Sequence, residues 1–196
     1  MNLPNKLTVL RMVLIPFMMF FYLASFIPYG IGKIVALVIF IVAALTDLLD
    51  GKIARKHNLV TNLGKFLDPI ADKILTATAL FMLMADGTIP APYGVIAITI
   101  IIARDFMVSA LRLIAASQGT VLAADIWGKA KTMVQMIAIP ICMLIPFLVA
   151  LSNVSEWLVL TVQIIGWVAL AVATVLTIVS GVNYLVKNRQ CFKDSK

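Results

Sequence analysis

The chain is built from apolar segments of about 20 residues, separated by short polar breaks. An α-helix of that length spans the hydrocarbon core of a bilayer. Hydrophobic residues make up 62% of the 196 residues and charged residues only 13%, a composition too apolar for a soluble domain of this size. The sequence therefore predicts an all-α, polytopic integral membrane protein.

Six transmembrane helices are expected, at residues 12–26, 34–49, 63–84, 93–116, 131–151 and 157–185. Residues 3–11 are expected to form a short interfacial helix before them, with Pro4 at its start. No small-residue cleavage site follows the first apolar run, so we expect this run to be retained. The loops are short and no internal repeat is found, so residues 1–196 are expected to form a single membrane domain.

The formal charge of +7 is explained by topology. Six helices place both termini on one side of the membrane, and nearly all Lys and Arg residues outside the helices fall on that side, whereas Lys33 stands almost alone opposite. Loops rich in Lys and Arg face the cytoplasm. We therefore expect both termini to be cytoplasmic, and the absence of a basic domain argues against a nucleic-acid partner.

Four aspartates stand at helical spacing around one predicted cytoplasmic loop. They belong to the pattern Asp47-x2-Asp50-Gly51-x2-Ala54-Arg55-x8-Gly64-x3-Asp68-x3-Asp72. Each aspartate pair projects from one face of its helix, and the two helices are expected to be antiparallel neighbours. Carboxylates gathered in a partly dehydrated setting repel one another unless cations neutralise them, and oxygen ligands suit hard divalent ions. The pattern therefore predicts a metal site, with room at Gly51 and Gly64 for phosphates to approach the backbone.

This pattern matches, at every fixed position, the signature of the CDP-alcohol phosphatidyltransferases, which the chain resembles. The resemblance implies that two divalent cations, Mg²⁺ or Mn²⁺, clamp the diphosphate of a CDP-linked lipid. It assigns Asp47, Asp50 and Asp68 as metal ligands, and Asp72 as a residue at the metal edge that acts as general base. Gly51, Ala54 and Arg55 match positions that shape the CDP-binding wall. Asn5, Thr8 and Arg11 match the family's amino-terminal segment, where closing over the nucleotide and interfacial anchoring are equally good readings.

Within the family, the full length is most similar to the bacterial phosphatidylglycerophosphate synthases. The similarity rests on residues 3–11, 58–73, 103–112 and 127–132. It implies CDP-diacylglycerol and sn-glycerol 3-phosphate as substrates, the bacterial cytoplasmic membrane as location, an active site that faces the cytoplasm, and a homodimer. Asp105 departs from the Glu that is commoner at its position, which keeps the charge but shortens its reach.

An acceptor that carries a phosphate needs cations near the aspartates. Arg112, Lys129 and Lys131 stand at the expected cytoplasmic ends of the fourth and fifth helices, where cations are also expected from topology alone. Arg104 lies deeper, and a charge inside a membrane must be paired or face a polar cavity. Two readings of Arg104 stay open: phosphate binding, or a structural ion pair with Asp105 or another acid.

Three alternatives also stay open. Another acceptor would keep the chemistry: phosphatidylglycerol would make a cardiolipin synthase, and inositol phosphate or serine is less favoured. A divalent-cation transporter predicts acidic residues near the membrane midplane and at corresponding places in two repeats. In this sequence the aspartates stand at predicted helix ends, and no repeat is found. A purely structural role would pair the aspartates with nearby Lys and Arg residues, a costly use of intramembrane charge.

Overall fold

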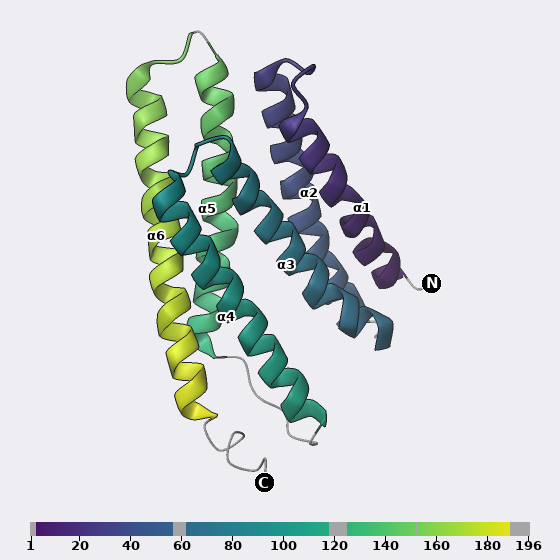
Figure 1. Ribbon diagram of the computed structural model, residues 1–196. Coiled ribbons are helices and arrows are strands. Elements are labelled where there is room, and N and C mark those ends of the chain that lie inside the picture. The colour runs from purple at the N-terminus through teal and green to yellow at the C-terminus, as the bar shows by residue number, and fades with distance from the viewer. Residues whose placement is uncertain (1–2, 57–61, 118–124, 152, 189–196) are drawn as a thin grey trace.

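The computed structural model describes residues 3–56, 62–117, 125–151 and 153–188, and the side chains of residues 3–4, 48–56, 62–66 and 116–117 lie outside this description. In these ranges the chain forms six helices and no strands: α1 (Leu3–Leu23), α2 (Tyr29–Lys56), α3 (Asn62–Ala85), α4 (Ala91–Ser117), α5 (Ile126–Ala150) and α6 (Glu156–Lys187) (Figure 1). The all-α prediction is confirmed.

Five of the described helices, all except α3, are long and apolar enough to cross a membrane. In its first half α3 carries Asp68, Asp72 and Lys73, and charges at this density lower its apolar character. Large apolar side chains on the outside of the bundle, among them Phe106 and Trp157, are exposed, as expected where a protein faces lipid. The chain is therefore a multi-pass membrane protein.

The first helix differs from the prediction. Residues 3–11 are helical but form the first turns of α1, without a separate interfacial helix. No glycine or proline interrupts the chain between Arg11 and the apolar residues that follow, so the helix continues. Thr8 and Arg11 are buried, and their contacts hold these turns to the bundle.

Three further boundaries differ from the prediction by five residues or more. One is the start of α2, which was expected at residue 34 but lies at Tyr29. α2 was expected to end at residue 49 but continues to Lys56, and α5 was expected to begin at residue 131 but begins at Ile126. Neither stretch contains a proline, so the helix runs on into the polar segment that hydropathy assigns to a loop. As a result Asp50, Lys129 and Lys131 all stand on helices rather than at helix ends.

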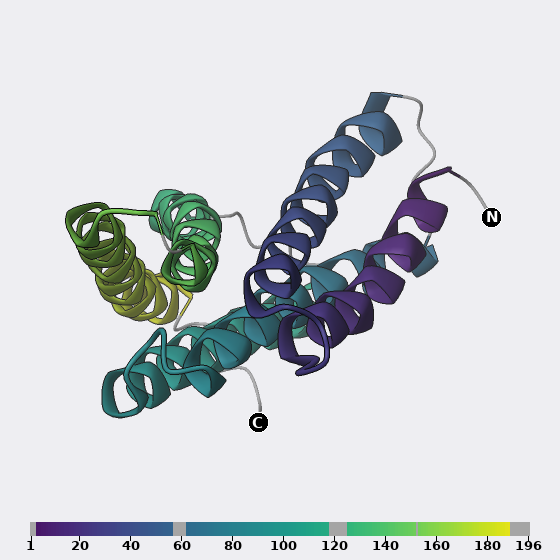
Figure 2. The ribbon, with the colours of Figure 1, turned by 90° about the horizontal axis from the view of Figure 1, so that it is seen from above.

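In Figure 1, α3 runs obliquely between the α1/α2 pair and the group formed by α4, α5 and α6. α5 packs against α2, α3 and α6, and α1 packs against α2 and α3. Figure 2 shows the same two groups from above. The start of α1 and the end of α6 lie toward the end of the bundle at which α2 ends and α3 begins, which we call the aspartate end. The buried apolar core includes Met18, Phe40, Leu75, Leu83 and Met143.

The opposite end of the bundle carries a buried ion pair. Nζ of Lys33, near the start of α2, lies 3.1 Å from Oδ2 of Asp86, in the turn after α3. The hydroxyl of Tyr22 in α1 donates a hydrogen bond to the same Asp86 oxygen, and the Lys33 ammonium stands 3.4 Å from the centroid of the Tyr22 ring. These contacts join α1 and α2 to the turn after α3, so Lys33 has a structural partner at this end of the bundle.

Candidate active site

The first turns of α1 lie against the aspartates of α2 and α3. Nη1 of Arg11 is 2.7 Å from Oδ1 of Asp47, and the Arg11 side chain is fully buried. About one turn earlier, the hydroxyl of Thr8 donates a hydrogen bond to Oδ1 of Asp68. Asn5 is buried one further turn toward the N-terminus. The segment that resembles the family's amino-terminal motif therefore lies directly over the acidic residues.

The carboxylates of Asp47, Asp68 and Asp72 are close enough to act on one another electrostatically. Asp47 repels both Asp68 and Asp72, whereas Arg11 attracts Asp47 and Asp72. Repulsion between carboxylates that are partly withdrawn from water is relieved by positive charge nearby. Arg11 supplies such a charge in this structure.

The donor set fits hard divalent cations in its chemistry, because every predicted ligand is a carboxylate. Side chains are described for Asp47, Asp68 and Asp72, while that of Asp50 lies outside the description. Among the side chains that are described, no three from His, Cys, Asp and Glu converge as a ready-made metal site. A cation between α2 and α3 would therefore share Asp47 with the Arg11 guanidinium or displace it.

The predicted nucleotide wall lies partly outside the description. Gly51, Ala54 and Arg55 belong to the last two turns of α2, and Gly64 to the first turn of α3. These turns flank the aspartates along each helix. Because nothing is described of the side chains there, the roles of these four residues stay predictions.

A cavity of about 730 Å³ lies beside Asp72, between α3, α4 and α5. Its wall includes all four residues predicted to bind the acceptor phosphate: Arg104, Arg112, Lys129 and Lys131. The structure thus brings the predicted base and the predicted anion-binding residues to one cavity, although three different helices carry them. Their functional roles stay predictions.

Asp105 joins two of these cations. Nη1 of Arg104 lies 3.2 Å from Oδ1 of Asp105, and Nζ of Lys131 lies 2.7 Å from Oδ2 of the same carboxylate. The Lys131 side chain is almost completely buried. One carboxylate therefore neutralises part of the positive charge on the cavity wall and connects α4 to α5.

Arg104 is held from α5 and α6 as well. Its Nη2 donates a hydrogen bond to the hydroxyl of Ser180 in α6. A Cβ atom at Gly128 would lie 2.9 Å from Nη2 of Arg104, and one at Gly181 would lie 3.2 Å from its Cγ. The glycines leave the space that the arginine fills. Of the two readings left open for Arg104, the ion pair with Asp105 is the one that these contacts favour.

Arg112 and Lys129 are the more accessible cations of the cavity. Both are exposed, and among the described residues neither forms an ion pair. The Arg112 guanidinium carbon stands 5.6 Å from the centroid of the Tyr184 ring, which orients the side chain without neutralising it. These two residues offer the charge with which an incoming anion can pair.

Several polar residues on the cavity wall were not predicted as site residues. Lys73 donates a hydrogen bond to the hydroxyl of Ser109, and Thr76 and Gln135 are buried within the same wall. A signal was available, because Thr76 follows Asp72 by four residues and Gln135 follows Lys131 by four, so each shares a helix face with a predicted site residue. Single polar residues in apolar helices are otherwise hard to interpret.

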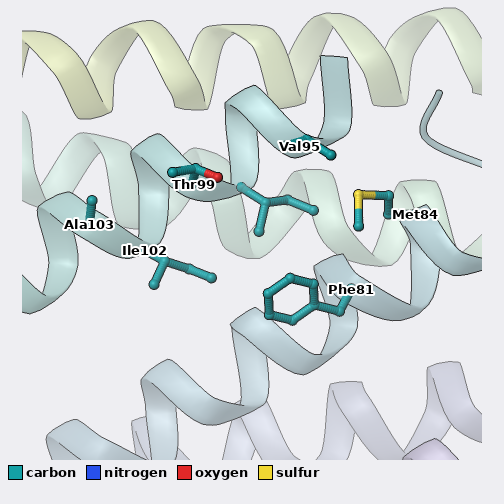
Figure 3. Close-up of a pocket in the computed structure, with 7 residues that line it drawn as sticks. Phe81, Met84, Val95, Thr99, Ile102 and Ala103 are labelled. Carbon is teal, nitrogen blue, oxygen red and sulfur yellow. The ribbon is translucent and has the colours of Figure 1, made fainter. Parts of the chain in front are cut away.

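A second cavity, of about 340 Å³, lies between α3 and α4 (Figure 3). Phe81 and Met84 of α3 face Val95, Thr99 and Ile102 of α4 across it. Its wall contains no charged residue. This cavity therefore offers no ionisable group, in contrast to the cavity beside Asp72.

Comparison with known proteins gives consistent results. The family model for CDP-alcohol phosphatidyltransferase matches residues 1–179. A Bacillus subtilis protein named CDP-diacylglycerol–glycerol-3-phosphate 3-phosphatidyltransferase is 40% identical, over 99% of this chain and 98% of its own length. A Rickettsia bellii protein of the same name is 35% identical over 97% of both chains. A Mycobacterium tuberculosis protein named as a probable phosphatidylglycerophosphate synthase is 37% identical, over 95% of this chain and 81% of its own. Together with the site geometry, these matches show that the chain is an enzyme of the CDP-alcohol phosphatidyltransferase family.

Proposed function

We propose that this enzyme transfers the phosphatidyl group of CDP-diacylglycerol to sn-glycerol 3-phosphate, giving phosphatidylglycerophosphate and CMP. The observation that carries the proposal is the position of Asp72, which shares the wall of one cavity with five basic side chains. Such a wall suits a small alcohol that bears a phosphate. The names of the full-length relatives support the same pair of substrates.

In this reaction a hydroxyl oxygen of glycerol 3-phosphate attacks the phosphorus that carries the diacylglycerol. The bond from that phosphorus to the bridging oxygen of the diphosphate breaks, and CMP leaves with that oxygen. Asp72 takes the proton of the attacking hydroxyl as general base. Its place on the cavity wall, one turn beyond Asp68 on the same face of α3, supports this role.

The basic residues of the cavity orient the acceptor. Arg112 and Lys129 are exposed and pair with its phosphate as it enters. Lys131 and Arg104 form ion pairs with Asp105, so part of their charge is already neutralised. Their role is to define the shape and the electrostatic potential of the cavity wall, and they bind the phosphate less directly than Arg112 and Lys129 do. Held in this way, the acceptor presents its hydroxyl to Asp72, and positioning of this kind lowers the barrier.

Two divalent cations, Mg²⁺ or Mn²⁺, are part of the proposal. Asp47, Asp50, Asp68 and Asp72 would hold them, and the oxygen-only donor set supports this assignment. When bound, such cations neutralise the diphosphate and stabilise the departing CMP. Gly51, Ala54, Arg55 and Gly64 would line the CDP side, with Asn5 and Thr8 covering it from α1.

The aspartate end of the bundle is proposed to face the cytoplasm of a bacterial cell. The excess of Lys and Arg toward this end of the chain's helices and in the C-terminal tail supports the orientation. The lipid substrate would enter from the adjoining leaflet and glycerol 3-phosphate from the cytosol.

A homodimer is also proposed, from the family resemblance, and light scattering of the protein in detergent would test it.

Two alternatives from the sequence receive less support. Family membership favours an enzyme over a divalent-cation transporter. A cardiolipin synthase would use phosphatidylglycerol as acceptor, and neither the names of the relatives nor the basic residues of the cavity wall favour it.

The test is CMP release from CDP-diacylglycerol by the purified protein in detergent with Mg²⁺ or Mn²⁺. Glycerol 3-phosphate, phosphatidylglycerol, inositol phosphate and serine are offered separately. We expect release only with glycerol 3-phosphate, and loss of release when EDTA removes the metal. Turnover with another acceptor alone would overturn the substrate assignment, and turnover in EDTA would overturn the metal assignment.

A further inference from the structure

Two uncharged polar residues, Thr76 and Gln135, line the deeper part of the cavity beside Asp72. α3 and α5 both run inward from the aspartate end, so a higher residue number on either helix means a deeper position. Thr76 lies one turn deeper than Asp72 on α3, and Gln135 lies one turn deeper than Lys131 on α5. Thr76 is 8% exposed and Gln135 only 3%, yet both line the cavity.

The amide oxygen of Gln135 is unsatisfied. Oε1 is buried and has no hydrogen-bond partner among the residues that the structure describes. Thr76 differs, because its hydroxyl donates to the backbone carbonyl oxygen of Asp72 at 3.1 Å. Buried polar atoms in native proteins are nearly always paired, so an unpaired amide oxygen on a side chain that lines a cavity points to a partner that the cavity can supply.

The chemistry of an amide oxygen restricts what it can bind. It accepts hydrogen bonds and does not donate them, so it binds an O–H or N–H group and not the oxygens of a phosphate. The exposed cations Arg112 and Lys129 are the better partners for a phosphate. A hydroxyl group is therefore the fitting partner for Gln135.

We propose that Gln135 is a specificity-determining residue that accepts a hydrogen bond from the second hydroxyl of the acceptor, the one on C2 of glycerol 3-phosphate. The inference rests on the proposed function, in which Asp72 accepts the proton of the reacting hydroxyl and the basic residues bind the phosphate. Those assignments leave the C2 hydroxyl as the one remaining donor of the acceptor. Gln135 then selects a glycerol backbone over simpler phosphorylated alcohols.

The test compares two acceptors that differ only at C2. Glycerol 3-phosphate carries the hydroxyl, whereas 3-hydroxypropyl phosphate lacks it but keeps the reacting hydroxyl and the phosphate. We expect wild-type enzyme to prefer glycerol 3-phosphate by about tenfold or more in kcat/KM, since a site built to bind a hydroxyl discriminates against an analogue without one. Equal use of both acceptors by the wild type would overturn the inference without any variant.

The variant Gln135→Met removes the amide at similar volume. It is expected to lower kcat/KM for glycerol 3-phosphate about tenfold, and to change it for 3-hydroxypropyl phosphate by less than about twofold. Gln163→Met, in the half-buried part of α6 outside the cavity, is the matched control and keeps the wild-type preference. Gln135→Asn, which keeps the amide but shortens it, is expected to show the same selective loss if Gln135→Met fails to fold.

Two outcomes count against Gln135. An equal loss with both acceptors assigns it to packing, and an undiminished preference assigns the hydroxyl to another residue. Failure of the proposed function is distinguishable, because wild-type enzyme would then ignore glycerol 3-phosphate while it releases CMP with a different alcohol.

Discussion

Nη1 of Arg11 lies 2.7 Å from Oδ1 of Asp47, and this contact ties the first turns of α1 to the acidic end of α2. The Arg11 side chain is fully buried, whereas Asp47 keeps 33% of its side-chain surface exposed. An arginine in this position supplies positive charge to a set of carboxylates that repel one another. The amino-terminal segment is thus part of the acidic site.

Arg11→Met is expected to destabilise the protein by about 2 kcal/mol and to reduce CMP release. Loss of one partner leaves a carboxylate without its counter-charge, and the partial exposure of Asp47 keeps the effect below that of a fully buried pair. Thermal unfolding in detergent measures the first effect. Lys6→Met, on an exposed part of α1, is the control. Equal melting temperatures for the two variants would show that the ion pair contributes nothing.

Asp105→Asn is expected to destabilise the protein by about 3 kcal/mol, because Arg104 and the almost fully buried Lys131 would both lose their carboxylate partner. Asp105→Glu keeps the charge and is expected to retain most of the stability and activity. Unfolding temperature and CMP release are measured for both variants. Identical behaviour of Asn and Glu at this position would show that the negative charge of Asp105 is not what matters.

Arg112→Gln and Lys129→Gln are each expected to raise KM for glycerol 3-phosphate about threefold to tenfold, with a smaller effect on kcat. Both side chains are exposed and without an ion pair in the described part of the chain, so they are available to the phosphate. The wild-type KM is also expected to rise with salt. Lys6→Gln, outside the cavity, provides the comparison. A fall in kcat at unchanged KM would place these residues in the chemical step.

Lys33→Met is expected to cost about 3 kcal/mol of stability without changing KM for glycerol 3-phosphate. Lys33 and Asp86 form a buried pair at the end of the bundle opposite the aspartates. The double variant Lys33→Met/Asp86→Leu is expected to lose less than the sum of the single losses, because neither charge is then left alone. Strict additivity of the three unfolding free energies would contradict this coupling.

The sequence predicts the membrane class and the all-α fold, because apolar length and helical spacing are local properties. Local patterns fail where tertiary contacts decide. Residues 3–11 continue into α1 because Thr8 and Arg11 are buried against aspartates more than thirty residues away in the sequence, a contact that no local periodicity reveals.

The same limit applies inside the cavity. The basic residues of α4 and α5 were predicted as a group from their expected depth, but only the packing of α3, α4 and α5 places them beside Asp72. The sequence could not separate the two readings of Arg104, because its surroundings come from other helices. Gly128 of α5 and Gly181 of α6 leave space for the Arg104 side chain, and Ser180 of α6 accepts its hydrogen bond. Gln135 was not predicted as a site residue, although it follows Lys131 by four residues and therefore shares a helix face with it.

The central claim is that Asp72 activates glycerol 3-phosphate for attack on CDP-diacylglycerol. The most direct measurement is the transfer of labelled glycerol 3-phosphate into the lipid-extractable fraction by wild-type enzyme, Asp72→Asn and Glu156→Gln, in which the same chemical change is made at an exposed position at the start of α6. We predict transfer by the wild type and Glu156→Gln, and a loss of about a hundredfold or more in Asp72→Asn at an unchanged unfolding temperature. Transfer by Asp72→Asn at a rate near that of Glu156→Gln would contradict the account.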